Sequence, residues 1–169
     1  MEVNENECRT NGYFTMPKVK RNELIEPLVK IYTQNPMYIA SLVLYGEIGI
    51  GKQQLIQEVV DKLQTSTIKE IIHTDVNFNL LSKSNIYHPN KEIFKINSSP
   101  LVINILTFSG LNEIPLITNI EIGKALLDRE IYGQKIPDNT FITLIVDMPT
   151  DFSFPRALSN KLSHIEIED

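Results

Sequence analysis

Apolar residues along the chain follow two patterns, compact runs and single positions at helical spacing. The compact runs, with one alternating stretch near the end, predict five strands at residues 42–45, 68–73, 101–106, 141–147 and 164–167. Helical spacing predicts helices within residues 22–33, 52–64, 116–131 and 155–161. Strands that alternate with helices indicate a parallel sheet covered on both faces. The sequence therefore predicts an α/β fold of three layers.

Each of the longer predicted helices has one apolar face, which we expect to pack on the sheet. These faces consist of Leu24, Leu28 and Ile31 in the first helix, Leu55, Val59 and Leu63 in the second, and Leu116, Ile120, Leu127 and Ile131 in the third. Residues 1–20 are polar and mixed, and predict a loose N-terminal arm. We expect residues 21–169 to form one domain.

The first predicted strand leads into a glycine-rich turn. Gly46, Gly51 and Lys52 fit the pattern G-x-x-x-x-G-K, and a predicted helix begins near the lysine. Glycines let the backbone curl with its N–H groups pointing inward, and the helix adds its positive N-terminal end. This order of strand, turn and helix predicts a phosphate-binding loop of the P-loop NTPase class.

We expect the loop to hold a nucleotide, with Lys52 reaching the outer phosphates. The predicted nucleotide-binding residues are Gly46, Glu47, Ile48, Gly49, Ile50, Gly51, Lys52, Gln53 and Gln54. Gln53 stands where a Ser or Thr hydroxyl would contact Mg²⁺, and an amide is a poorer and bulkier magnesium ligand. The alternative is a glycine-rich turn that binds nothing.

The composition narrows the class of protein. The chain has 169 residues, 42% of them hydrophobic and 22% charged, as in ordinary globular domains. A net charge of -5 argues against general nucleic-acid binding or an anionic membrane surface, and we expect the basic cluster at Lys18, Lys20 and Arg21 to be solvated. Cys8 is the only cysteine, so no intrachain disulfide can form. The apolar runs of the chain are too short to span a bilayer. We expect a cytoplasmic protein.

Other candidate chemistry is sparse. The three histidines lack H-E-x-x-H spacing, and we expect loop or surface positions for His73, His88 and His164. The serines between the later strands, including Ser109, lie in no nucleophile-elbow pattern.

Three segments together resemble the large domain of an AAA+ ATPase, most closely the MoxR and AAA_5-type branch, over residues 22–168. They are the phosphate loop at 46–52, Ala125–Asn139 and Pro155–Leu162. The resemblance implies a P-loop sheet with strand order 5-1-4-3-2, bound ATP or ADP with Mg²⁺, and assembly into oligomers. It also implies a helical lid after the last strand. The chain stops there, so we expect the lid and its sensor 2 arginine to be absent from it.

Several positions depart from the family's catalytic pattern. Thr107 and Phe108 occupy the two acidic Walker B positions, and neither side chain can act as a base. The sensor 1 Asn-Pro is replaced by Met148 and Pro149. The arginine finger corresponds to Lys161, which lacks the planar guanidinium fork.

Two acidic residues could substitute for the missing groups. The strand order that the resemblance implies puts Asp147 directly beside the phosphate-loop strand, where it could face the metal position. The competing interpretation is a strand-ending aspartate that caps a turn. Glu113 could act as a base, but equally suits the start of a helix.

The sequence thus predicts a reduced AAA+-like protein that binds ATP or ADP through residues 46–53. Without the acidic pair, sensor 1 and the arginine finger, we expect a weak or inactive ATPase that acts as a binding or assembly module. Its partner would be a second copy or an active AAA+ relative. Two alternatives stay open: an active Mg²⁺-dependent ATPase that uses Lys52 and Asp147, and an interaction protein with an empty loop.

Overall fold

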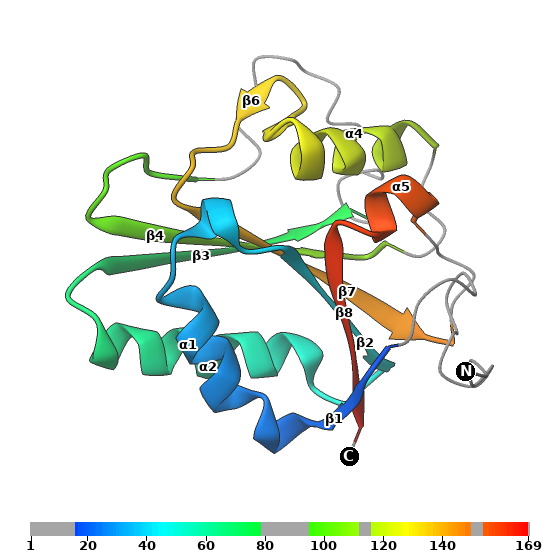
Figure 1. Ribbon diagram of the computed structural model, residues 1–169, viewed down its shortest axis with the longest axis horizontal. Helices are drawn as coiled ribbons and strands as arrows, with labels where there is room; N and C mark the ends of the chain where they lie inside the picture. Colours follow the sequence, from blue (N-terminus) through cyan, green and yellow to red (C-terminus); the bar gives the residue numbers. More distant parts are fainter. Residues whose placement is uncertain (1–15, 79–94, 112–115, 150–153, 169) are drawn as a thin grey trace.

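The computed structural model describes residues 16–78, 95–111, 116–149 and 154–168, and contains a parallel sheet of six strands (Figure 1). The strands, in their order across the sheet, are β1 (Lys18–Lys20), β8 (Leu162–Glu168), β2 (Ser41–Glu47), β7 (Thr140–Met148), β4 (Val102–Ser109) and β3 (Glu70–Asn77). All five pairings between neighbours are parallel. With the five predicted strands numbered along the chain, this order is 5-1-4-3-2, so the predicted fold class and strand order are confirmed.

Helices cover both faces of the sheet. The helices are α1 (Ile25–Tyr32), α2 (Lys52–Ser66), α4 (Leu116–Leu127) and α5 (Arg156–Ser159), with 3₁₀ turns η1 (Arg21–Glu23) and η2 (Pro36–Tyr38). Figure 1 shows α1 and α2 on one side of the sheet and α4 and α5 on the other. Two separate hydrophobic clusters fill the interfaces, one against each helix pair. The predicted three-layer sandwich is therefore present.

Alternate side chains of each central strand belong to the two hydrophobic clusters on opposite faces of the sheet. In β2, Leu42 and Leu44 pack toward α1 and α2, while Val43 and Tyr45 pack toward α4 and α5. Successive side chains of a strand point to opposite faces, and a parallel sheet covered on both faces needs apolar residues on each. The apolar face predicted for α2 is confirmed, because Leu55, Val59 and Leu63 are fully buried.

The N-terminal arm ends earlier than predicted. Lys18–Lys20 pair with Glu166–Glu168 as a parallel edge strand, and the amide of Glu166 donates to the carbonyl oxygen of Pro17 at 2.9 Å. Met16 is buried in the core. No apolar run marks this strand, because an edge strand of three residues buries only its middle side chain in part. Residues 1–15 lie outside the described part of the chain.

The segment after α4 also differs from the prediction. Helix α4 ends at Leu127, and Ile131 lies in a small hairpin of β5 (Glu130–Ile131) and β6 (Gln134–Lys135). Tyr132 and Gly133 form its two-residue turn, both with positive φ (46° and 80°), which suits a type I′ turn. The buried side of the helix carries Ile122 and Ala125, whereas Ile120 and Leu127 of the predicted face are exposed.

The third predicted region that shifted is the second strand. It begins at Glu70 and extends to Asn77, so Ile68 lies before it and is fully exposed. The run of β-branched residues led us to expect that the strand starts at Ile68. The observed start is set by hydrogen bonding to the neighbouring segment, where the amide of Glu70 donates to the carbonyl oxygen of Leu101 at 3.0 Å.

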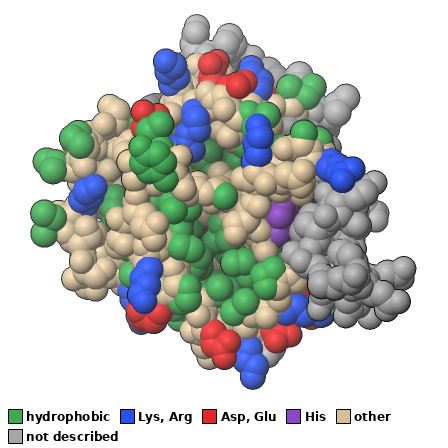
Figure 2. Space-filling model, viewed as in Figure 1, with side chains coloured by type: hydrophobic (Ala, Val, Ile, Leu, Met, Phe, Trp, Pro, Cys, Tyr) green, Lys and Arg blue, Asp and Glu red, His purple; other side chains and the backbone are tan. Residues whose placement is uncertain are grey.

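Figure 2 shows the surface of the molecule from the same side. Hydrophobic side chains gather across its middle, and the Lys and Arg side chains are interspersed with Asp and Glu around the periphery. This face therefore lacks the single basic patch that nucleic-acid binding would need. Among the described helices, none is long and apolar enough to cross a membrane.

Candidate phosphate-binding site

The phosphate loop, residues 46–52, connects the end of β2 to the first residue of α2. Gly49 and Gly51 have φ of 88° and 92°, a conformation that residues with a side chain rarely adopt. The amide of Ile50 donates to the carbonyl oxygen of Glu47 at 3.2 Å, and the amide of Leu55 starts the helix by donating to Gly51 at 2.8 Å. The predicted sequence of strand, glycine turn and helix is thus observed.

Gly46 allows the loop to fold back over its own strand. A Cβ atom at this position would lie 3.1 Å from Cγ2 of Ile50, 3.3 Å from the carbonyl oxygen of Ile167 and 3.4 Å from Cδ of Lys52. The first two of these distances are tighter than ordinary van der Waals contact. The close approach brings the backbone and Lys52 together, and makes room for the curl that an anion cradle requires.

Lys52 lies inside the curl, with only 4% of its side chain exposed. Its ammonium group donates to the carbonyl oxygens of Gly46 (2.7 Å) and Glu47 (2.9 Å), and its Nζ lies 2.9 Å from Oδ1 of Asp147. An ammonium group has three N–H donors. These three acceptors therefore match its full donor capacity.

Asp147 reaches the lysine from the neighbouring strand. The register pairs it with Gly46, as the predicted strand order requires. Phe141 and Ile145 of β7 pack toward α1 and α2, so alternation puts Asp147 on the same face as Lys52. Its side chain is 45% exposed. The carboxylate is thus held by a buried cation and is also open to solvent.

Arg21 is a part of the site that sequence reasoning missed. Its Nε donates to the carbonyl oxygen of Gly51 at 3.3 Å, and its Nη2 forms an ion pair with Glu58 at 3.0 Å. The side chain is mostly buried, whereas we expected a solvated basic cluster. It links η1 to both the loop and α2. Only the three-dimensional fold brings these residues together, because thirty positions separate Arg21 from Gly51.

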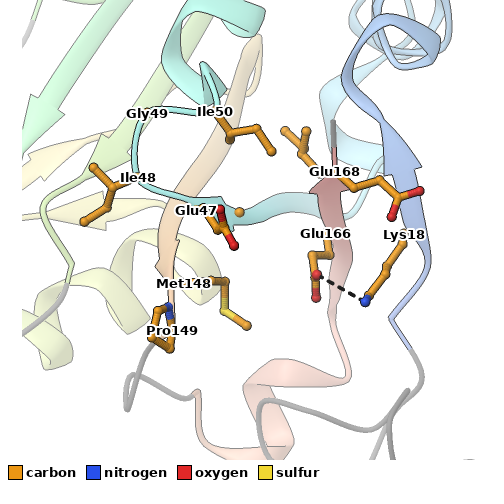
Figure 3. Close-up of a pocket in the computed structure, with 11 residues that line it drawn as sticks. Lys18, Glu47, Ile48, Gly49, Ile50, Met148, Pro149, Glu166 and Glu168 are labelled. Carbon is orange, nitrogen blue, oxygen red and sulfur yellow. Dashed lines mark ion pairs between the residues drawn. The ribbon is translucent and has the colours of Figure 1, made fainter.

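A cavity of about 610 Å³ lies beside the loop, and we call it the acidic cavity (Figure 3). Its polar wall consists of Lys18, Glu47, Glu166 and Glu168, and Lys18 lies 3.7 Å from Glu166. Figure 3 shows the side chains of Glu166 and Lys18 directed toward each other. Met148, which occupies the sensor 1 position with Pro149, also lines it.

The acidic wall of the cavity and Lys52 lie on opposite faces of the sheet. Met148 packs with the cluster under α4 and α5, and Glu47 and Glu166 share its face because strand side chains alternate. Lys52 and Asp147 lie on the α1–α2 face. The loop backbone therefore lies between the Lys52–Asp147 ion pair and the acidic wall of the cavity.

The two residues assigned to the Walker B acids do not reach the loop. Thr107 pairs with Thr143, and Thr143 pairs with Leu42, which lies four residues before Gly46, or about 13 Å along the strand. Phe108 points to the opposite face and is fully buried.

A histidine holds Thr107 in place. Nε2 of His73 lies 3.0 Å from the Thr107 hydroxyl, and Nδ1 lies 3.3 Å from the side-chain oxygen of Gln57. Burial lowers the pKa of His73, and the nearby carboxylate of Asp75 opposes that shift. The expectation of a loop or surface histidine is wrong here.

His164 is also buried, contrary to expectation. Its Nδ1 lies 2.8 Å from the hydroxyl of Tyr45, and its Nε2 lies 3.0 Å from the carbonyl oxygen of Ser159. The carbonyl can only accept, so Nε2 donates and Nδ1 accepts from the tyrosine. Burial lowers the pKa of His164. This network fastens α5 to the sheet. His88 lies outside the described residues.

Ser109, which fits no catalytic motif in the sequence, is the last residue of β4. Its side chain is 5% exposed, and its hydroxyl finds no hydrogen-bond partner among the described residues. Alternation from Ile103 and Ile105 places it on the α1–α2 face, the face of Lys52 and Asp147. A buried hydroxyl without a partner is unusual.

The remaining predicted site residues lie either on the first turn of α2, next to the loop, or away from it. Gln53 and Gln54 are exposed on the first turn of α2. Lys161 is exposed directly before β8. It lies at the end of the strands opposite the loop, about 20 Å from Gly46 along the strand direction. It could act only on another molecule. Glu113 lies outside the described residues.

Comparison with known proteins found similar solved structures only. No protein-family model and no curated protein matches the chain. Among solved structures it is similar to NtrX from Brucella abortus in complex with ATP, with 13% identity, a TM-score of 0.53, and coverage of 88% of this chain and 35% of that one. It is also similar to ORC2 from Aeropyrum pernix (ADPNP-ADP complexes), with 15% identity, a TM-score of 0.48, and coverage of 94% and 50%.

The chain therefore spans a third to a half of the length of these proteins. At such low identity, the likeness to NtrX bears on the fold alone. Together with the sheet order, it identifies an α/β sandwich of the P-loop NTPase type with an AAA+-like arrangement of strands.

Proposed function

We propose that the chain binds ATP or ADP through residues 46–53 and works as a binding or assembly module with little or no ATPase activity. The observation that carries this proposal is the curled loop around Lys52, with glycines at each position where the backbone needs them. The loop amides, the N-terminus of α2 and Lys52 would hold the phosphates. The NtrX structure, which was determined with ATP, supports the proposal by its fold.

The magnesium position fits less well than the phosphate position. Gln53 offers an exposed amide instead of a hydroxyl, and Asp147 is engaged with Lys52. The Walker B residues Thr107 and Phe108 supply no carboxylate. An arginine finger alone can contribute about 10³–10⁵ in rate, and Lys161 is a weaker substitute. The proposal therefore separates nucleotide binding from hydrolysis.

A titration of fluorescent ATP and ADP against the protein tests this proposal, with and without Mg²⁺. We expect saturable binding that falls at least about tenfold in Lys52→Ala, because the cradle loses the ammonium group that the loop encloses. Lys62→Ala is the matched control, since Lys62 lies on the same helix and pairs with Glu26 at the surface. Equal binding by both variants would contradict the proposed site.

One observation favours a second candidate, an active Mg²⁺-dependent ATPase. Asp147 lies beside Gly46 on the face of Lys52, where a strand-ending carboxylate could contact a metal. This candidate predicts Mg²⁺-dependent turnover that both Lys52→Ala and Asp147→Asn abolish. Vigorous turnover in the wild type would replace the proposed weak enzyme with this one. If millimolar ATP shifts neither the melting temperature nor the fluorescence, the interaction protein with an empty loop remains.

Assembly is the third part of the proposal. The resemblance to AAA+ proteins suggests a second copy or an active AAA+ relative as the partner, and the exposed Lys161 could face a neighbouring molecule. Light scattering with and without ADP tests self-association. If the protein is monomeric under both conditions, an active AAA+ relative remains as the proposed partner.

A further inference from the structure

We infer that Asp147 is an internal competitor for the phosphate, which holds Lys52 in the place of a ligand oxygen and so sets the affinity of the loop. The inference rests on the proposed nucleotide binding. It assigns Asp147 a role opposite to that of a metal ligand, because the carboxylate would oppose phosphate binding instead of assisting it.

The first argument is the saturation of Lys52. Its three N–H donors match three acceptors within 2.9 Å, namely two backbone carbonyls and the carboxylate of Asp147. A phosphate oxygen can therefore bind the ammonium group only if one of these acceptors leaves or shares its donor.

The second argument is that the acceptors differ in how easily they can leave. The carbonyls of Gly46 and Glu47 belong to the last residues of β2, whose backbone is fixed by pairing with β7. The Asp147 side chain is 45% exposed, so water can solvate its carboxylate once it turns away. The carboxylate is thus the acceptor that a phosphate would displace.

The third argument explains why the carboxylate is there. A buried ammonium group without a counter-charge is costly, and only 4% of the Lys52 side chain is exposed. Asp147 meets that requirement when no ligand is bound. A phosphate group would meet it equally well, so the two anions compete for one cation, and repulsion between them adds to the competition.

Asp147→Asn tests the inference, since it removes the charge and keeps the size. In EDTA, we expect the variant to bind ADP about fivefold more tightly than the wild type, the value of a half-exposed ion pair. Asp75→Asn is the matched control, because Asp75 is 53% exposed but lies on β3, three strands away from β2. It makes the same change in net charge and should leave the ADP affinity unchanged.

Isothermal titration with ADP in EDTA gives the comparison, and thermal melting checks that each variant folds. Asp147→Ala serves as the second variant if the asparagine is poorly folded. The gain should disappear when Lys52→Ala is added, because the competition needs the ammonium group.

The outcomes separate the inference from the proposed function. Unchanged or weaker ADP binding by Asp147→Asn in EDTA overturns the inference, while binding by the wild type would still stand. Unchanged binding in EDTA together with weaker binding in Mg²⁺ also overturns it, and assigns the carboxylate to a metal. If neither the wild type nor the variants bind ADP, the proposed function itself fails.

Discussion

Two strand ends on the same face of the sheet differ in how they are built. At the end of β2, a buried cation, two glycines with positive φ and a helix N-terminus converge within seven residues. At the end of β4, Thr107 is held by His73 and the hydroxyl of Ser109 has no partner among the described residues. The first arrangement suits an anion, whereas the second supplies no charge. Under the proposed function, nucleotide binding would depend on the end of β2 and hydrolysis on the end of β4, so that one could be lost without the other.

The largest expected effect tests the β2 side of this comparison. Gly51→Ala should destabilise the fold by about 1–2 kcal/mol, because a residue with Cβ is strained at φ of 92°. The new Cβ would also lie 3.0 Å from Nε of Arg21, so the loop should shift and ADP binding should fall. Urea denaturation and the ADP titration measure the two effects.

Gly123→Ala is the control for that substitution. Gly123 lies within α4 and has nothing within 4 Å of the added Cβ. Alanine should therefore stabilise the helix by about 0.5–1 kcal/mol. If the two variants changed the stability equally, strain in the loop would not explain the destabilisation by Gly51→Ala.

An intermediate effect concerns His73 at the β4 side. Burial lowers its folded-state pKa below the ordinary value of 6.5, so the unfolded chain binds the proton more readily. The stability that neutral His73 contributes is thus complete above pH 6.5 and is lost as the pH falls below it. Urea denaturation between pH 8 and 5 should show a steeper loss for the wild type than for His73→Gln. Parallel curves would mean that His73 titrates normally.

The smallest expected effect has the opposite sign. Ser109→Ala removes a hydroxyl that is buried without a partner, and should stabilise the protein by about 1 kcal/mol. Ser163→Ala, at an exposed position in β8, should change stability little. A clear destabilisation by Ser109→Ala would show that the hydroxyl has a function at the β4 strand end, and would weaken the contrast with β2.

Local patterns predicted the β2 side well. The apolar run before Gly46, the glycine spacing and the helical face of α2 all lie within about twenty residues, and each matches a structure that local physics favours. The position of Asp147 followed from the strand order alone.

Features that depend on distant partners were missed. Arg21 reaches Gly51 only through the fold, and His164 is buried because α5 and Tyr45 cover a strand whose alternation suggested exposure. Tyr132 has a positive φ in its turn although it is not a glycine, which no propensity rule anticipates. The same limit applies to Thr107, whose distance from the loop depends on the register of three strands.

The pairing of Lys52 has a consequence for the rate at which an anion arrives. A free ammonium group at the mouth of a site would draw anions in over several ångströms, but here its field is largely cancelled by Asp147 at 2.9 Å. The protein around it carries a net charge of -5. Diffusing nucleotides would therefore meet the loop by unassisted collision, and selectivity would arise after the encounter, at the exchange of one oxyanion for another.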